Sequence, residues 1–195
     1  TSILEFSNKS LGEKIIPTLC DDDNLKPYGA CRVCSVEVQH TEDGPKRTVA
    51  SCHTPINPGM RIYTNSDSVK TLRRNIVELV LSDHPPDCLT CEVNGNCELQ
   101  DVAASVGVRR IRYAKGKNHC DREKDLSHAY MRMDLSKCIN CSRCVRACDE
   151  VQGQFTLTMT GRGFESRITT DNDMLFGDSS CVSCGACAQT CPTSA

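Results

Sequence analysis

The 195-residue sequence contains few large apolar side chains: aromatic residues make up 4% of it, and tryptophan is absent. A chain with so little apolar bulk cannot easily build several independent hydrophobic cores. Its longest apolar stretch, Ile76–Leu81, is interrupted by Glu78 and is too short to span a bilayer. The net charge of −2 excludes a generally basic nucleic-acid binder. No signal segment opens the chain, so we expect a soluble protein of the reducing cytoplasm.

Cysteine is the residue in excess, with 16 in the chain. Disulfide scaffolds of secreted proteins spread their cysteines at varied spacings, whereas these fall into four groups, three of them with short gaps. Short gaps allow several thiolates to converge on one metal centre. The pattern therefore favours metal sites over disulfides. Zinc is the main alternative to iron–sulfur clusters, because paired Cys-x2-Cys units also bind zinc.

The strongest pattern is a run of four cysteines that occurs twice, with 32 residues between the copies. The copies are Cys138-x2-Cys141-x2-Cys144-x3-Cys148 and Cys181-x2-Cys184-x2-Cys187-x3-Cys191-Pro192. In two-cluster bacterial ferredoxins, the fourth cysteine of each such run ligates the other cluster. The sequence therefore predicts two 4Fe–4S clusters, one held by Cys138, Cys141, Cys144 and Cys191 and the other by Cys181, Cys184, Cys187 and Cys148. Asp149 replaces the proline expected after the first run, a departure that touches no ligand.

Two smaller cysteine groups precede these runs. The first is Cys20-x10-Cys31-x2-Cys34 followed by Cys52, and its gap of ten departs from the plant-type 2Fe–2S pattern. Its spacing favours a 2Fe–2S cluster and leaves zinc as the alternative. The second, Cys88-x2-Cys91-x5-Cys97, has three thiols and is preceded by His84 across a stiff Pro85-Pro86 link.

Three thiolates and one imidazole can hold a 4Fe–4S cluster, so His84 is the candidate fourth ligand. From spacing alone, a zinc site with the same four ligands is equally consistent. Cys120 lies alone in a polar segment and is interpreted as a non-ligand. The other histidines are interpreted as surface or hydrogen-bonding residues: His40, His53, His119 and His128.

Local patterns predict an α+β fold. Ser2 and Glu5 form a capping box for a helix that stops before Gly12. Apolar spacing predicts helices from Asp67 to the prolines at 85–86 and over residues 98–106. Short strands are predicted over residues 33–39, 48–52, 60–64, 155–160 and 164–169, and a loose, solvated linker over 108–128. We expect three domains: a 2Fe–2S ferredoxin-type domain (1–66), a His/Cys cluster domain with its linker (67–129), and a double 4Fe–4S ferredoxin domain (130–195).

The order of these motifs resembles the N-terminal region of three protein families. They are the NuoG-type subunit of respiratory complex I, the iron-only hydrogenases, and the catalytic alpha subunit of NAD-dependent formate dehydrogenases. Three strings carry the resemblance, namely those at 26–31 (KPYGAC), 82–88 (SDHPPDC) and 138–153 (CINCSRCVRACDEVQG). The strings at 161–168 (GRGFESRI) and 181–187 (CVSCGAC) look most like formate dehydrogenase.

This resemblance implies more than the spacing does. It implies a 2Fe–2S cluster on the first group and His84 as a cluster ligand. It also implies a β-grasp domain that lacks its first hairpin and a chain truncated at both ends, with a molybdopterin domain holding molybdenum or tungsten beyond the last ligand. The implied function is an electron relay, without catalytic residues of its own, between a formate site and a flavin/NAD-binding iron–sulfur subunit. The alternatives are the equivalent relay of a hydrogenase or complex I subunit and, more remotely, a zinc-binding interaction module.

Overall fold

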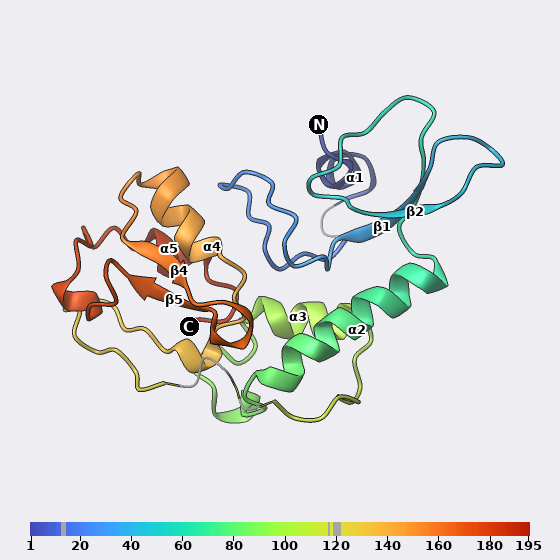
Figure 1. The fold of residues 1–195 in the computed structure, drawn as a ribbon. Helices are drawn as coiled ribbons and strands as arrows, with labels where there is room; N and C mark the ends of the chain where they lie inside the picture. The colour runs from blue at the N-terminus through green and yellow to red at the C-terminus, as the bar shows by residue number, and fades with distance from the viewer. Residues whose placement is uncertain (13–14, 117, 119–121) are drawn as a thin grey trace.

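The computed structural model describes residues 1–12, 15–116, 118 and 122–195. Three successive parts of the chain occupy different regions of the molecule (Figure 1). A small sheet with one helix comes first, two helices lie in the middle, and a hairpin with two short helices forms the last part. The mixture of short helices and strands agrees with the predicted α+β class.

The first part combines α1 (Ile3–Leu11) with an antiparallel sheet. The capping box is confirmed, since the Ser2 hydroxyl accepts the Glu5 N–H at 3.1 Å and the Glu5 carboxylate accepts the Ser2 N–H at 3.0 Å. The strand order is β2-β1-β3, and the strands are β1 (Ser35–Gln39), β2 (Arg47–Ala50) and β3 (Arg61–Tyr63). The three predicted strands are therefore present with narrower bounds, and Val36 and Val38 of β1 turn into a core shared with α1.

The middle part consists of α2 (Asp67–Asp83) and α3 (Glu98–Ser105), with a single 3-10 turn, η1 (Cys88–Thr90), between them. The Ser66 hydroxyl caps α2 by accepting the Val69 N–H, and α2 ends before Pro85-Pro86, as predicted. These helices build a core that takes side chains from all three parts, among them Val33, Val77, Leu99 and Ile139. A sequence poor in large apolar residues thus shares one core between modules.

The described residues of the segment after α3 are mostly exposed, as predicted, but several of them are held by hydrogen bonds. Arg112 donates to the buried Glu78 carboxylate of α2 at 2.7 Å, and the Gly116 N–H donates to the Ser82 carbonyl at 2.7 Å. The Asn118 amide donates to the Ser136 carbonyl at 2.8 Å. The first two bonds fix Arg112 and Gly116 against α2, and the third ties Asn118 to the start of the last part. His119 and Cys120, both interpreted above as non-ligands, lie outside the described residues.

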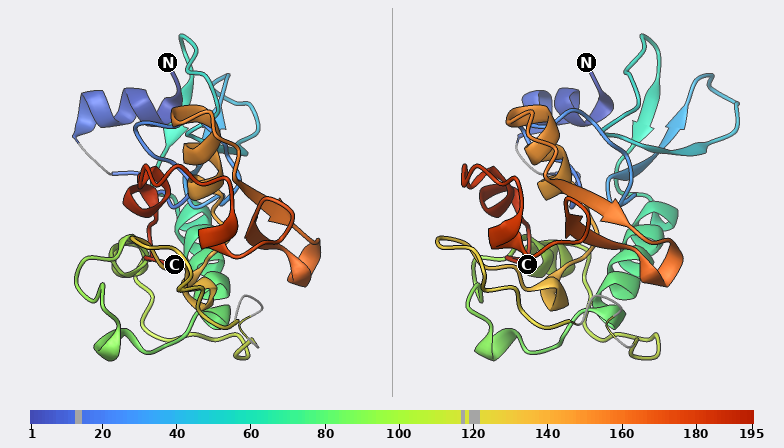
Figure 2. Two further views of the ribbon diagram at one scale, coloured as in Figure 1. Left: turned by 90° about the vertical axis from the view of Figure 1, so that its left-hand side faces the viewer. Right: turned by 60° about the vertical axis from the view of Figure 1, so that its left-hand side comes forward.

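The last part contains an antiparallel hairpin of β4 (Leu157–Thr160) and β5 (Arg167–Thr170), close to the predicted strands. Two short helices, α4 (Arg143–Arg146) and α5 (Ala186–Thr190), begin after the second cysteine of each run, contain the third, and lie side by side (Figure 2). A single π-helical turn, Ala147–Val151, continues α4. No helix in the described ranges combines the length and apolarity that a membrane crossing requires.

Candidate metal centres

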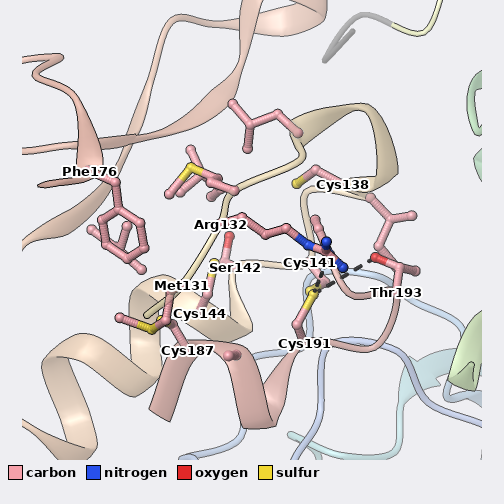
Figure 3. A pocket seen from close by; sticks show the side chains of 17 residues that line it. Met131, Arg132, Cys138, Cys141, Ser142, Cys144, Phe176, Cys187, Cys191 and Thr193 are labelled. Carbon is pink, nitrogen blue, oxygen red and sulfur yellow. Dashed lines mark hydrogen bonds between the residues drawn. The ribbon is translucent and has the colours of Figure 1, made fainter. Parts of the chain in front are cut away.

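The two cysteine runs surround two neighbouring cavities in the last part. The first cavity is bordered by three cysteines of the first run and the last cysteine of the second run: Cys138, Cys141, Cys144 and Cys191. Figure 3 shows these side chains around one space, with Cys187 also at its edge. The second cavity is bordered by the complementary set: Cys148, Cys181, Cys184 and Cys187. The structure therefore brings together the two crossed sets that the spacing predicts.

Local backbone conformation explains the crossing. The residue before α4, Ser142, and the residue before α5, Gly185, both have left-handed φ, at 62° and 76°. This conformation ends the cysteine loop abruptly and starts the helix. Each short helix then carries the fourth cysteine of its run away from the first three and toward the other cavity.

Three of the thiols around these cavities, those of Cys141, Cys144 and Cys187, have raised pKa values and are therefore unfavourable as free anions. Burial, together with the nearby Cys191 and Cys138, raises the pKa of Cys141 to about 12. Burial, together with the neighbouring Cys181, Cys184 and Cys148, raises the pKa of Cys187 to about 11. Iron binding needs thiolates, so a cationic cluster would supply the charge compensation that these buried sites lack. The fifteen cysteines in the described part of the chain are all free, so the donor set fits 4Fe–4S clusters.

The first cysteine group gathers at the end of the first sheet. Cys34 and Cys52 bring their Sγ atoms to 3.4 Å, and the Cys31 N–H donates to Cys20 Sγ at 3.4 Å. A hydrogen bond from the Cys31 thiol lowers the pKa of Cys20 to about 6, and one from the Cys52 thiol lowers the pKa of Cys34 to about 6. The same thiol bonds, together with burial, raise the pKa values of Cys31 and Cys52. Four adjacent thiols, of which two already favour the thiolate, fit a 2Fe–2S cluster.

The third group is less closely gathered. His84 follows the C-terminus of α2, and its buried Nδ1 has no hydrogen-bond partner among the described residues. Burial lowers the pKa of His84, and Lys137 lowers it further, so the ring is neutral, as a metal ligand must be. Cys88 is exposed and Cys97 is buried. The orphaned nitrogen fits a ligand, but His84 and Cys91 line separate cavities.

Single-metal geometry is not found at any of these groups. Within residues 1–12, 15–116, 118 and 122–195, no three or more His, Cys, Asp or Glu side chains are placed to hold one metal ion together. Cluster ligation differs in that the four cysteines bind two or four irons, so the sulfurs need not converge on one atom.

Two buried arginines that sequence reasoning missed join the cysteine-bearing segments. Arg143 donates to Asp22 and to Glu98, at 2.7 Å each, and so links all three parts of the chain. Arg146 donates to the carbonyl of Cys20 at 3.0 Å and lies over the Tyr28 ring at 4.8 Å. The sequence offers one signal for these contacts. Both arginines lie in the first cysteine run, on the short helix α4, which must face either solvent or another part of the chain.

Three family models match successive stretches of the chain. A 2Fe-2S iron-sulfur cluster binding domain matches residues 9–67, the NADH-ubiquinone oxidoreductase-G iron-sulfur binding region matches 73–112, and a 4Fe-4S dicluster domain matches 137–195. A 2Fe–2S domain and 4Fe–4S domains are therefore present, as the cysteine spacing and the resemblance predicted.

Longer oxidoreductase subunits contain a similar region. The NADP-reducing hydrogenase subunit HndD of Solidesulfovibrio fructosivorans is 41% identical over 92% of this chain, which spans 31% of that subunit. An NADH-quinone oxidoreductase subunit of the G type from Rhizobium meliloti is 33% identical over 92% of the chain, which spans 20% of that protein. A Staphylococcus haemolyticus protein, named only provisionally as a formate dehydrogenase, is 32% identical over the whole chain, which spans 19% of it.

A solved structure shares the fold throughout. The crystal structure of NAD+-reducing [NiFe]-hydrogenase in the H2-reduced state contains a chain with a TM-score of 0.87 and 30% identity. The match covers all of this chain and 79% of the other. The arrangement of the three parts is therefore one that an experimentally determined oxidoreductase also has.

Proposed function

We propose that this chain serves an NAD-dependent formate dehydrogenase, because it belongs to a family of iron–sulfur electron-relay regions. This family occurs in NuoG-type subunits of NADH-quinone oxidoreductases and in related hydrogenase and formate dehydrogenase subunits. In this role, formate loses two electrons and one proton to become carbon dioxide at a molybdopterin centre that lies outside these 195 residues. The electrons cross this chain one at a time and reduce NAD+ at a flavin-containing partner subunit in the cytoplasm.

The proposal assigns four clusters to the chain. A 2Fe–2S cluster is held by Cys20, Cys31, Cys34 and Cys52, and the crossed sets of the last part hold two 4Fe–4S clusters. A third 4Fe–4S cluster is held by His84, Cys88, Cys91 and Cys97. When bound, the clusters supply reversible one-electron acceptors, and the protein fixes their spacing and excludes water. The two cavities bordered by crossed cysteine sets are the observation that carries this assignment.

Contacts between cysteine-bearing segments support a continuous route. Arg146, which lies in the first run, donates to the Cys20 carbonyl, so the 2Fe–2S loop touches the last part directly. Cys97 Sγ lies 3.6 Å from the carbonyl of Pro192, the residue after Cys191. The third group therefore adjoins the first cavity of the last part. We propose that electrons pass from the ferredoxin clusters to the His84 cluster and then to the 2Fe–2S cluster.

The choice of formate rests on the strings at 161–168 and 181–187. A relay in a hydrogenase is the second candidate, since the hydrogenase subunit is 41% identical to the chain. To test this, the purified native complex is given NAD+ and either formate or hydrogen as reductant, and NADH formation is measured. NADH formation with formate, together with bound molybdenum or tungsten, supports the proposal. NADH formation with hydrogen alone would support the second candidate and overturn the first.

A further inference from the structure

The two cysteine loops share one backbone design. In each loop the residue two positions after the first cysteine has left-handed φ, at 51° for Asn140 and 58° for Ser183. In each, the N–H of that residue donates to the Sγ of the first cysteine, at 3.3 Å for Cys138 and 3.4 Å for Cys181. The left-handed turn is what points this N–H at the sulfur.

Residues with a side chain adopt this conformation at a cost, which is smaller for Asn140 than for Ser183, so a partner that holds each loop stabilises it. In the first loop, the Asn140 amide donates to the Ser166 carbonyl at 2.9 Å. In the second loop, the Ser183 hydroxyl lies 3.0 Å from Nε2 of His128. A side chain 55 residues away in sequence therefore replaces the backbone anchor of the first loop.

The His128 ring is itself held from several sides. Its Nδ1 accepts the N–H groups of Tyr130 at 3.1 Å and Met131 at 3.2 Å, so in the neutral ring Nε2 carries the proton and donates to Ser183. The ring centroid lies 4.9 Å from that of the buried Phe176. Met131 and Phe176 line both cavities, including the one bordered by the second cysteine set. His128 thus stands on a fixed support next to the loop it contacts.

We propose that His128 is a positioning residue that sets the reduction potential of the cluster on Cys148, Cys181, Cys184 and Cys187. By holding Ser183, it maintains the N–H bond to the Cys181 thiolate. A donor to a cluster thiolate stabilises the more negative, reduced state, and hydrogen bonds to the sulfurs are among the factors that set such potentials. The inference rests on the proposed cluster assignment and assigns a role to a histidine that is no ligand.

The test is a redox titration of the full-length enzyme followed by electron paramagnetic resonance, with iron and sulfide measured on every sample. His128→Ala is expected to lower the potential of one 4Fe–4S cluster and leave the other clusters unshifted. His128→Gln, which can still donate to Ser183, is expected to keep the reduction potential close to that of the wild type. His40→Ala, at an exposed histidine, is the matched control and is expected to change nothing.

A double variant separates positioning from other effects of the histidine. Ser183→Ala breaks the same link from its other end, so His128→Ala and Ser183→Ala are expected to give equal shifts that do not add in combination. The inference would be overturned if the two shifts in reduction potential add, if the potential rises because water enters, or if it is unchanged at full iron content. If the His128→Ala enzyme lacks the cluster, the Ser183→Ala enzyme takes its place, because its His128 ring keeps its packing. Its reduction potential then tests the inference in the same way. A wild-type enzyme without this 4Fe–4S cluster would instead overturn the proposed function.

Discussion

His84 is the residue at which ligand identity matters most. Within the part of the chain that the structure describes, its buried Nδ1 has no hydrogen-bond partner, an arrangement that is costly unless the nitrogen has another role. Neutral imidazole differs from cysteinate by one charge, so a shell of three cysteines and one histidine is less negative than a shell of four cysteines. His84 and His128 would thus act on clusters in different ways, His84 by binding iron and His128 through a backbone hydrogen bond.

We predict that His84→Cys retains a four-iron cluster and lowers its reduction potential. The added negative charge disfavours the reduced state, in keeping with the raised potentials of Rieske centres, where histidines replace cysteines. His84→Ala is expected to leave an open iron site and a labile or partly lost cluster. Redox titration followed by electron paramagnetic resonance measures both. An unshifted potential in the first variant, with full occupancy in the second, would mean that His84 is not a ligand.

At the scale of elements, the short helices α4 and α5 decide which cysteines meet. Each starts from a left-handed residue and moves the fourth cysteine of its run toward the other cavity. Without these helices the eight cysteines would form two sets that are each local in sequence. Crossed sets tie the two runs together across the intervening hairpin, so each cluster becomes a cross-link of the last part.

Cys148→Ala tests the crossing directly. The variant is expected to damage the cluster on Cys181, Cys184 and Cys187, although these lie more than thirty residues away. Electron paramagnetic resonance and iron analysis are the measurements, and Cys120→Ser, at the predicted non-ligand, is the control that should keep all iron. Selective loss of the cluster on the neighbouring Cys138 would contradict the crossed assignment.

Helices whose ends are set by neighbouring residues were predictable from the sequence. Ser2 and Glu5 cap α1 within three residues, and Pro85-Pro86 stops α2, so both helices could be placed from short strings. The contacts of Arg143, Arg146 and His128 were not predictable in the same way. Arg146 reaches Cys20 across 126 positions, and no local pattern reports which surface a short helix will meet.

At the scale of the whole molecule, the cysteines stand inside the apolar clusters. Cys34 and Cys52 belong to the first core, Cys97 to the shared core and Cys148 to the core of the last part. Each core contains few large side chains, in line with the composition. Packing alone therefore contributes little stability per module, and metal binding is expected to contribute a large part of the folding free energy.

Iron removal should consequently unfold the chain. With every proposed site filled, the chain carries fourteen irons, two at the first site and four at each of the others, and no structural zinc. Chelation or oxygen damage is expected to abolish the near-ultraviolet signal of ordered side chains and to raise proteolytic sensitivity. Circular dichroism and iron analysis on the same samples provide the measurement. Native structure in a fully iron-free sample would refute this expectation.

The arrangement of the three parts depends on Arg143, whose side chain is 5% exposed. It binds Asp22 beside the first cysteine group, Glu98 of α3 and, within the last part, Thr190 of α5. Removing one partner of a buried ion pair leaves uncompensated charge and costs about 3–5 kcal/mol. Arg143→Met is therefore expected to lower the denaturant midpoint strongly and to release the 2Fe–2S cluster first, because Asp22 adjoins Cys20. The control is Arg61→Met at the exposed Arg61–Glu42 pair, which should cost at most about 1 kcal/mol. If both variants unfold at the wild-type midpoint with all iron retained, Arg143 does not hold the parts together.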